Sequence, residues 1–129
     1  MEKFLETLTD NGIEIKRLYI GGSYVSLKPE PQDIDILVCW KPNQKVTNNK
    51  QLSEFIDKRA TIFDQSLIES KFQIQAHFQC LLGATDTTIH MVGKWIFINS
   101  YHRESGIHRG IVCFENLDVT KLIKGENYV

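Results

Sequence analysis

The chain has 129 residues, of which 42% are hydrophobic and 24% are charged, as expected of one globular domain with its own core. Lys and Arg number 15 against 16 Asp and Glu, for a net charge of −1, which excludes a broadly basic surface for a polyanion. The polar start is unlike a signal peptide, and no apolar run reaches the roughly 18 residues of a membrane helix. We therefore expect one cytoplasmic domain over residues 1–129, with no membrane contact and no strong nucleic-acid signal.

The first part of the chain predicts a helix followed by two strands. Apolar residues recur at helical spacing in residues 2–11, and an Asn-Gly pair then provides a stop. The segment IEIKRLYI (13–20) is rich in β-branched and aromatic residues and ends at a glycine pair, which is typical of a strand. After a proline-containing loop, IDILVCW (34–40) predicts a strong and largely buried strand.

The rest of the chain predicts helices that alternate with strands. Apolar residues at helical spacing predict a helix over 51–72, broken near Thr61, where two β-branched residues meet. The segment FQIQAHFQCLL (72–82) alternates in polarity, as a half-buried strand does. After a turn, we expect a helix to about Ser100, although IFINSY would also suit a strand, and RGIVCFE (109–115) is the last strand candidate.

This order of elements predicts an α+β fold with a short mixed β-sheet and helices mainly on one face. The three cysteines, Cys39, Cys80 and Cys113, are odd in number, far apart and set in apolar runs. They lack a C-x2-C metal spacing and are typical of buried thiols in a reducing compartment.

The segment IGGSYVSLKPEPQDIDIL (20–37) carries a glycine-serine turn followed by two acids. On a strand, Asp33 and Asp35 lie on the same face, and two close carboxylates repel each other unless a cation lies between them. Mg2+ takes such oxygen ligands and shares them with substrate phosphates. The turn Gly21-Gly22-Ser23 lets the backbone approach a ligand closely and offers donors to phosphate oxygens. If strands 13–20 and 34–40 are neighbours, the turn and the acids share one end of the sheet.

The segment GGSYVSLKPEPQDIDILV (21–38) resembles the signature of the nucleotidyltransferase superfamily with the polymerase-beta-like fold, which is Gly-Ser, a spacer and then Asp-x-Asp. More narrowly, the chain resembles small bacterial nucleotidyltransferase-like proteins. In these, GS-F-V-x-x-K-P-x-P-x-D-h-D is followed by a helix, a short strand and an aromatic segment that ends near R-G-I-V. The last part corresponds to WIFINSYHRESGIHRGIVCFE (95–115), so the resemblance covers most of residues 13–115. Its first motif is fairly specific and its second is weak.

The resemblance implies a minimal nucleotidyltransferase-like fold and a set of roles. Gly22 and Ser23 would hold the β- and γ-phosphates of a nucleoside triphosphate, with ATP as the expected nucleotide. Asp33 and Asp35 would bind two Mg2+ ions that stabilise the entering and leaving oxygens. A hydroxyl group of an unknown acceptor would attack the α-phosphorus, and pyrophosphate would leave.

Active members of the superfamily carry a third acid on a later strand. Here the matching strand, FQIQAHFQ (72–79), holds no acid; Gln75 stands at that position, and His77 follows on the same face. A glutamine offers one neutral oxygen and cannot act as a base, whereas His77 could act as a base or simply line a polar face. Two hypotheses follow: a weakened or inactive transferase that still binds nucleotide and metal, or an active enzyme that uses His77, Asp64 or Glu69.

Two basic residues are further candidates for contacts with a ligand or partner. Lys28, in the spacer, and Arg109, near the weak motif, could contact phosphates or an acidic partner, or could be ordinary loop residues.

Small members of the superfamily often act beside a second protein. The chain could therefore be a non-catalytic nucleotide-binding or protein-interaction module of a toxin–antitoxin or phage-defence pair, and a homo-oligomer is also compatible with the sequence.

Overall fold

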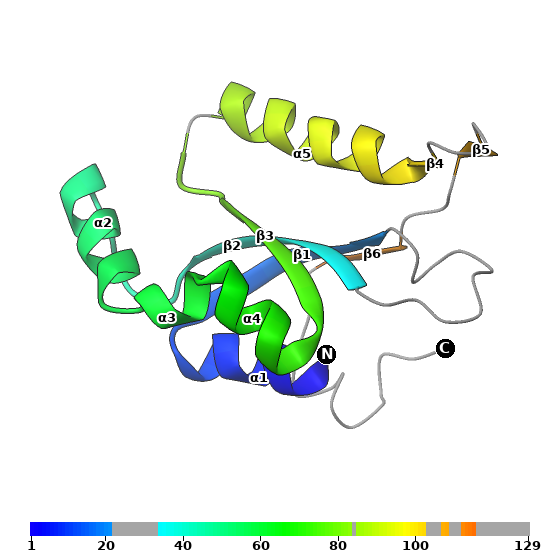
Figure 1. Cartoon of the computed structure of the whole chain (residues 1–129). Coiled ribbons are helices and arrows are strands. Elements are labelled where there is room, and N and C mark those ends of the chain that lie inside the picture. The colour runs from blue at the N-terminus through cyan, green and yellow to red at the C-terminus, as the bar shows by residue number, and fades with distance from the viewer. Residues whose placement is uncertain (22–33, 84, 103–106, 109–111, 116–129) are drawn as a thin grey trace.

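The computed structural model describes residues 1–21, 34–83, 85–102, 107–108 and 112–115. A four-stranded sheet with the strand order β3-β2-β1-β6 forms the centre of this part of the chain. In Figure 1, α1, α3 and α4 lie below the sheet, α2 lies at its left end and α5 lies above it.

The sheet is mixed, as the sequence predicts. Strand β1 (Ile13–Gly21) pairs antiparallel with β2 (Ile34–Pro42) and with β6 (Val112–Glu115), whereas β2 and β3 (Ile74–Cys80) run parallel. The expected adjacency of the first two strands is therefore confirmed. Of the last candidate, 109–115, the structure describes a strand from Val112 onwards. Strands β4 (Tyr101–His102) and β5 (Ile107–His108) form a separate antiparallel pair.

Four helices contribute to one side of the sheet: α1 (Glu2–Asp10), α2 (Asn49–Asp57), α3 (Ala60–Phe63) and α4 (Gln65–Phe72). The helix expected over 51–72 is thus three helices. One interruption lies just before Ala60, close to the break expected near Thr61, and a second, which was not expected, lies at Asp64. Asp64 has an extended backbone and accepts a hydrogen bond from the backbone N–H of Leu67 at 3.2 Å, which makes it the N-cap of α4.

The larger core lies between these helices and the sheet. Alternate residues of β2 and β3 point into it, because side chains alternate between the faces of a strand. It is closed by Trp40, whose ring stacks on Phe55 with a centroid distance of 6.0 Å. The buried members are Phe4, Leu5, Leu8, Ile13, Ile15, Leu18, Ile20, Ile36, Val38, Trp40, Phe55, Ile68, Ile74 and Ala76.

Helix α5 (Thr85–Ser100) covers the other face of the sheet. Its Trp95 packs with Tyr19, Leu37 and Cys39 in a smaller cluster. The segment IFINSY, which also suited a strand, continues this helix to Ser100, and strand structure begins at Tyr101. The α+β class with a mixed sheet and helices mainly on one face is confirmed for the described residues.

The exposure of the cysteines differs from the expectation of three buried thiols. All three are free; Cys39 is buried, Cys80 is half-buried and Cys113 is exposed. Cys113 lies on β6, one of the two edge strands of the sheet, so the prediction of burial is wrong for this residue. Within the described ranges, no helix combines the length and the apolar character needed to span a bilayer.

Candidate functional site

Three of the predicted site residues lie in one row across the sheet. Gly21, the last residue of β1, is opposite Asp35 of β2, and Asp35 is opposite Gln75 of β3. Neighbouring strands are about 4.8 Å apart, so this register places the end of the glycine turn, one acid and the glutamine side by side. The expectation that turn and acid share one end of the sheet is confirmed for Gly21 and Asp35.

The row faces α5 rather than the larger core. Ile36 and Ala76, which follow Asp35 and Gln75 in their strands, are buried in the core on the other side. Because side chains alternate along a strand, Asp35 and Gln75 point to the α5 side. Both are half-buried, and neither is without an interaction partner. The polar side chains at this end of the sheet are therefore held in a partly dry environment.

His77 lies further along β3 on the same face. It is opposite Leu37 of β2 and is exposed to solvent. The structure thus brings His77 near the row, two residues along from Gln75, as the strand pattern predicts. A proton acceptor at this position would be accessible to solvent.

Several predicted residues, Gly22, Ser23, Lys28, Asp33 and Arg109, lie outside the described residues. Among the residues that are described, no group of three or more His, Cys, Asp or Glu side chains is placed to hold a metal ion. The described donors at the row are one carboxylate, from Asp35, and one amide oxygen, from Gln75. Oxygen donors of this kind suit Mg2+, which usually completes its shell with water and substrate phosphates.

The two alternative acids, Asp64 and Glu69, lie on the side of the sheet opposite to Asp35. Asp64 is occupied as the N-cap of α4, and Glu69 lies within α4 itself. Helix α4 packs on the core face, where Gln65 donates a hydrogen bond to the backbone carbonyl of Ala76 at 2.6 Å. Neither acid is therefore on the face that carries Asp35, and the hypothesis that one of them replaces the third acid is wrong.

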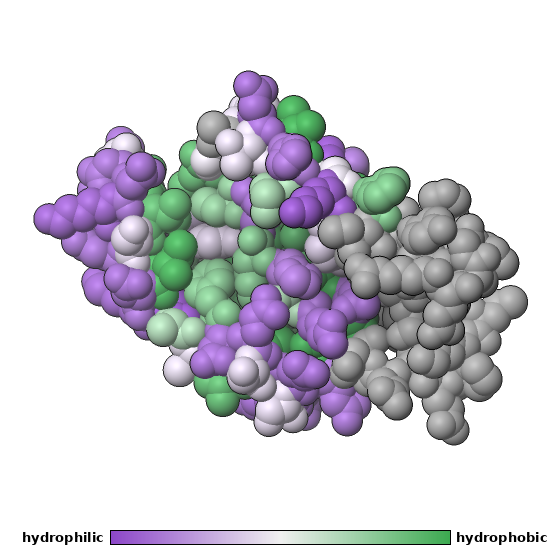
Figure 2. Space-filling view, turned by 45° about the horizontal axis from the view of Figure 1, so that its top comes forward, coloured by the Kyte–Doolittle hydropathy of each residue, from purple (hydrophilic) through white to green (hydrophobic). Residues whose placement is uncertain are grey.

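A cavity of about 510 Å3 lies between α5 and the sheet, on the same face as the row. Its apolar lining comes from both layers, and Lys16, Arg17 and Thr88 supply polar groups; the Thr88 hydroxyl is buried without a hydrogen-bond partner among the described atoms. Figure 2, turned so that the α5 side comes forward, shows hydrophobic side chains gathered in the middle of the view, beside the hydrophilic surface of α2. The complete lining is Lys16, Arg17, Tyr19, Cys39, Leu81, Thr88, Ile89, Val92, Gly93 and Ile96.

Sequence reasoning missed this cavity. Strand alternation identifies which residues of β1 share a face, but it does not say how closely α5 lies over them. The one signal in the sequence is that α5 is apolar on more than one side: Ile89, Met91 and Phe97 stay exposed while Trp95 is buried.

Two titratable groups in the cavity wall are held in fixed charge states near neutral pH. Burial raises the pKa of the Cys39 thiol to about 11, so this cysteine is protonated and is a poor nucleophile. A hydrogen bond to the Tyr19 hydroxyl, at 3.4 Å, and the ion pair with Glu115, at 3.2 Å, raise the pKa of Arg17. The cavity thus has a fixed positive charge at its edge and no reactive thiolate.

Comparison with known proteins gives one family. A family model described as "Family of unknown function (DUF6932)" matches residues 1–115. The chain has no significant match among curated proteins or among solved structures.

Proposed function

We propose that this chain, which belongs to the DUF6932 family of unknown function, binds a nucleoside triphosphate together with Mg2+ at the end of the sheet marked by Gly21, Asp35 and Gln75. The single observation that carries the proposal is their register: glycine, carboxylate and amide stand side by side on three neighbouring strands. A phosphate site needs close approach to the backbone, which glycine permits, and a metal site needs oxygen donors.

A cavity elsewhere on the same face of the sheet supports a nucleotide as the ligand. The cavity beneath α5 lies on the same face and, at about 510 Å3, has the size of a small-molecule pocket. Its walls are mostly apolar and include the ring of Tyr19, while Arg17 at its edge keeps a positive charge. An apolar wall for a base and donors for phosphates are the two environments that a nucleotide requires.

The reaction that fits such a complex is transfer of a nucleoside monophosphate to a hydroxyl group. The acceptor oxygen forms a bond to the α-phosphorus, the bond between that phosphorus and the bridging oxygen breaks, and pyrophosphate leaves with the bonding electrons. The hydroxyl proton passes to a base, and His77 is the described group on this face that can accept it. Positioning and charge neutralisation would supply most of the rate.

The neighbour of Asp35 favours a second candidate function. Gln75 occupies the position directly opposite Asp35 on β3 and brings no charge to the metal. A site with one fewer carboxylate holds Mg2+ less tightly and orients the acceptor less well. The alternative is therefore a non-catalytic nucleotide-binding module that acts on a partner protein, as in a toxin–antitoxin or phage-defence pair.

Binding is tested by calorimetric titration with ATP in the presence and absence of Mg2+. We expect binding that requires Mg2+ and that falls at least about tenfold in Asp35→Asn, because the variant keeps the shape and loses the charge. Asp57→Asn, which changes an acid in α2, is the matched control and should bind like the wild type. Absence of binding in the wild type, or equal binding by both variants, would contradict the proposal.

Turnover separates the two candidate functions. Incubation with ATP labelled at the α-phosphate, together with extract of the native host, should transfer label to an acceptor if the chain is a transferase. Labelled product that disappears in Asp35→Asn would support catalysis. A stoichiometric partner protein that stays unlabelled, together with Mg2+-dependent ATP binding, would support the binding module.

A further inference from the structure

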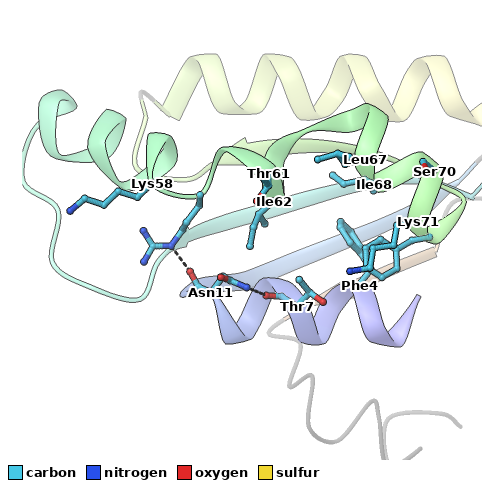
Figure 3. Close-up of a pocket in the computed structure, with 12 residues that line it drawn as sticks. Phe4, Thr7, Asn11, Lys58, Thr61, Ile62, Leu67, Ile68, Ser70 and Lys71 are labelled. Carbon is cyan, nitrogen blue, oxygen red and sulfur yellow. Dashed lines mark hydrogen bonds between the residues drawn. The ribbon is translucent and has the colours of Figure 1, made fainter.

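A second cavity, of about 470 Å3, lies in the helical layer on the opposite side of the sheet from Asp35. In Figure 3, Thr7 and Asn11 of α1 form one wall, and the segment with Thr61 and Ile62 forms the other. The volume is that of a small-molecule pocket. Its lining consists of Phe4, Thr7, Asn11, Lys58, Arg59, Thr61, Ile62, Leu67, Ile68, Ser70, Lys71 and Phe72.

The inner end of this cavity is apolar and rigid. Phe4 and Ile68 are almost fully buried, at 1% and 3% exposure, and belong to the main core. The rings of Phe4 and Phe72 pack with centroids 5.3 Å apart. Ile62 and Leu67 extend this surface towards solvent, and Leu67 is 50% exposed. A ligand in the cavity would therefore place an apolar group against these side chains, where burial of apolar surface is favourable.

The charged groups of the lining all have one sign. Lys58, Arg59 and Lys71 line the cavity, and no acidic side chain is among the lining residues that the structure describes. An apolar wall lowers the local dielectric response, so positive charges beside it attract an anion more strongly than they would in open water. The cavity is thus complementary to a negative charge on an otherwise apolar molecule.

Arg59 is held in place before any ligand binds. Its Nε donates to the backbone carbonyl of Asn11, its Nη1 donates to that of Phe55 at 3.1 Å, and its guanidinium carbon lies 3.6 Å from the centre of the Phe55 ring. These two bonds use two of the five N–H donors of the group. Arg59 is thus a fixed positive charge at the Asn11 end of the cavity.

Lys71 supplies a second, more adaptable charge. It lies in the last turn of α4, with its Nζ 5.4 Å from the centre of the Phe72 ring. Figure 3 shows its side chain directed from α4 towards α1, whereas Lys58 extends away at the other end. Lys71 therefore lies beside Phe72 and Phe4, at the buried apolar end of the cavity. Arg59, bonded to Asn11 after the end of α1, lies at the opposite end.

We propose that this cavity binds a small amphipathic anion: an apolar chain whose carboxylate is held by Lys71 and whose tail contacts Phe4, Ile68 and Ile62. The site is independent of the nucleotide site, because it lies in the α1–α4 layer and not beneath α5. It adds a second ligand class to the protein, and its occupancy would stabilise the folded state by mass action.

The test is a titration of 15N-labelled protein with sodium octanoate, followed by backbone amide NMR. We expect saturable shifts in α1 and α4, and an affinity about fivefold lower in Lys71→Gln, since one partly exposed charge is lost. Lys71 is exposed, so this variant should fold normally. Lys50→Gln, an exposed lysine of α2 outside the cavity, is the matched control and should bind like the wild type.

A second arm uses 1-octanol, which has the same chain and no charge. Weaker binding of octanol than of octanoate supports a site for an anion. Three results would overturn the proposal: no saturable shifts with octanoate, equal affinities of the Lys71→Gln and Lys50→Gln variants, or octanol binding as tightly as octanoate.

Discussion

The two faces of the sheet differ in how they are packed and in what they carry. The face covered by α1–α4 contributes to a cluster of 14 buried residues, whereas the face beneath α5 contributes to a cluster of four, among the residues that the structure describes. The sparsely packed face holds the row of Gly21, Asp35 and Gln75, and the cavity lies further along the same strands, at Arg17 and Cys39. Stability and the candidate nucleotide chemistry are thus divided between opposite faces of the same strands. Functional sites are commonly found where packing leaves room for a ligand.

Two adjacent residues of β2 test this division most strongly. Ile36 is fully buried in the larger cluster, and Leu37 is 4% exposed in the smaller one. We expect Ile36→Ala to lower the free energy of unfolding by about 4 kcal/mol and Leu37→Ala by about 2 kcal/mol, because a tightly packed site relaxes less around a cavity. Urea denaturation measures both. Equal losses, or a larger loss for Leu37→Ala, would contradict the claim that the faces differ in packing.

Gln75→Glu sharpens the comparison on the sparsely packed face. A carboxylate at this position, directly opposite Asp35, would repel that acid in the absence of metal and share a cation with it in its presence. We expect Mg2+ affinity to rise about tenfold and melting to become more dependent on Mg2+. A thermal melt at increasing Mg2+ concentration measures this, with Glu69→Gln on α4 as a control for acids of the other face. No change in Mg2+ dependence would contradict the placement of the metal.

The buried thiol of Cys39 predicts a pH dependence that originates on the α5 face. Burial raises its pKa from 9.0 to about 11, so between these values the unfolded state loses its proton first. Stability contributed by the protonated thiol is therefore complete below about pH 9 and falls as the pH rises, by about 1 kcal/mol at about pH 10. The free energies of unfolding of the wild type and Cys39→Ala, measured by urea denaturation at about pH 9 and about pH 10, isolate this contribution. A decline that is the same in both proteins would show that it has another source.

We expect Asp64→Ala to have the smallest effect. This variant distinguishes a role of Asp64 in stability from a role in metal binding. Loss of the N-cap bond to Leu67 should cost about 1 kcal/mol of stability. ATP binding should be unchanged after correction for stability, since Asp64 lies on the face opposite Asp35. A selective loss of Mg2+-dependent ATP binding in this variant would restore Asp64 as the third acid.

Sequence patterns predicted the strands well because their signals are local. Alternation in β3 and the apolar run of β2 follow from the two-residue period of a strand. The placement of Gln75 beside Asp35 was expected from the resemblance to the superfamily and not from any local pattern, and the register of β2 and β3 has this pairing. The break expected near Thr61 lies close to the interruption before Ala60. The break at Asp64 was not predicted, because an N-cap can be formed by any residue with a suitable side chain and backbone. The exposure of Cys113 was missed because an apolar neighbourhood in sequence does not reveal that a strand lies at a sheet edge.

Both cavities were beyond the reach of sequence patterns for a related reason. Arg59 precedes α3 as its N-cap residue and Lys71 lies in α4, so only the packing of α1 against α3 and α4 brings them to one cavity. Acidic and basic residues are mixed along residues 58–71. That the charged residues of the cavity lining are all basic becomes visible only in the folded structure.

The most direct test of the central claim is an amide NMR titration of the labelled protein with ATP and Mg2+. We predict saturable shifts at the ends of β1, β2 and β3, including the amides of Gly21, Asp35 and Gln75, that require Mg2+ and leave α1 and α4 unchanged. Absence of shifts, or shifts confined to the α1–α4 layer, would contradict a nucleotide and metal site on the α5 face.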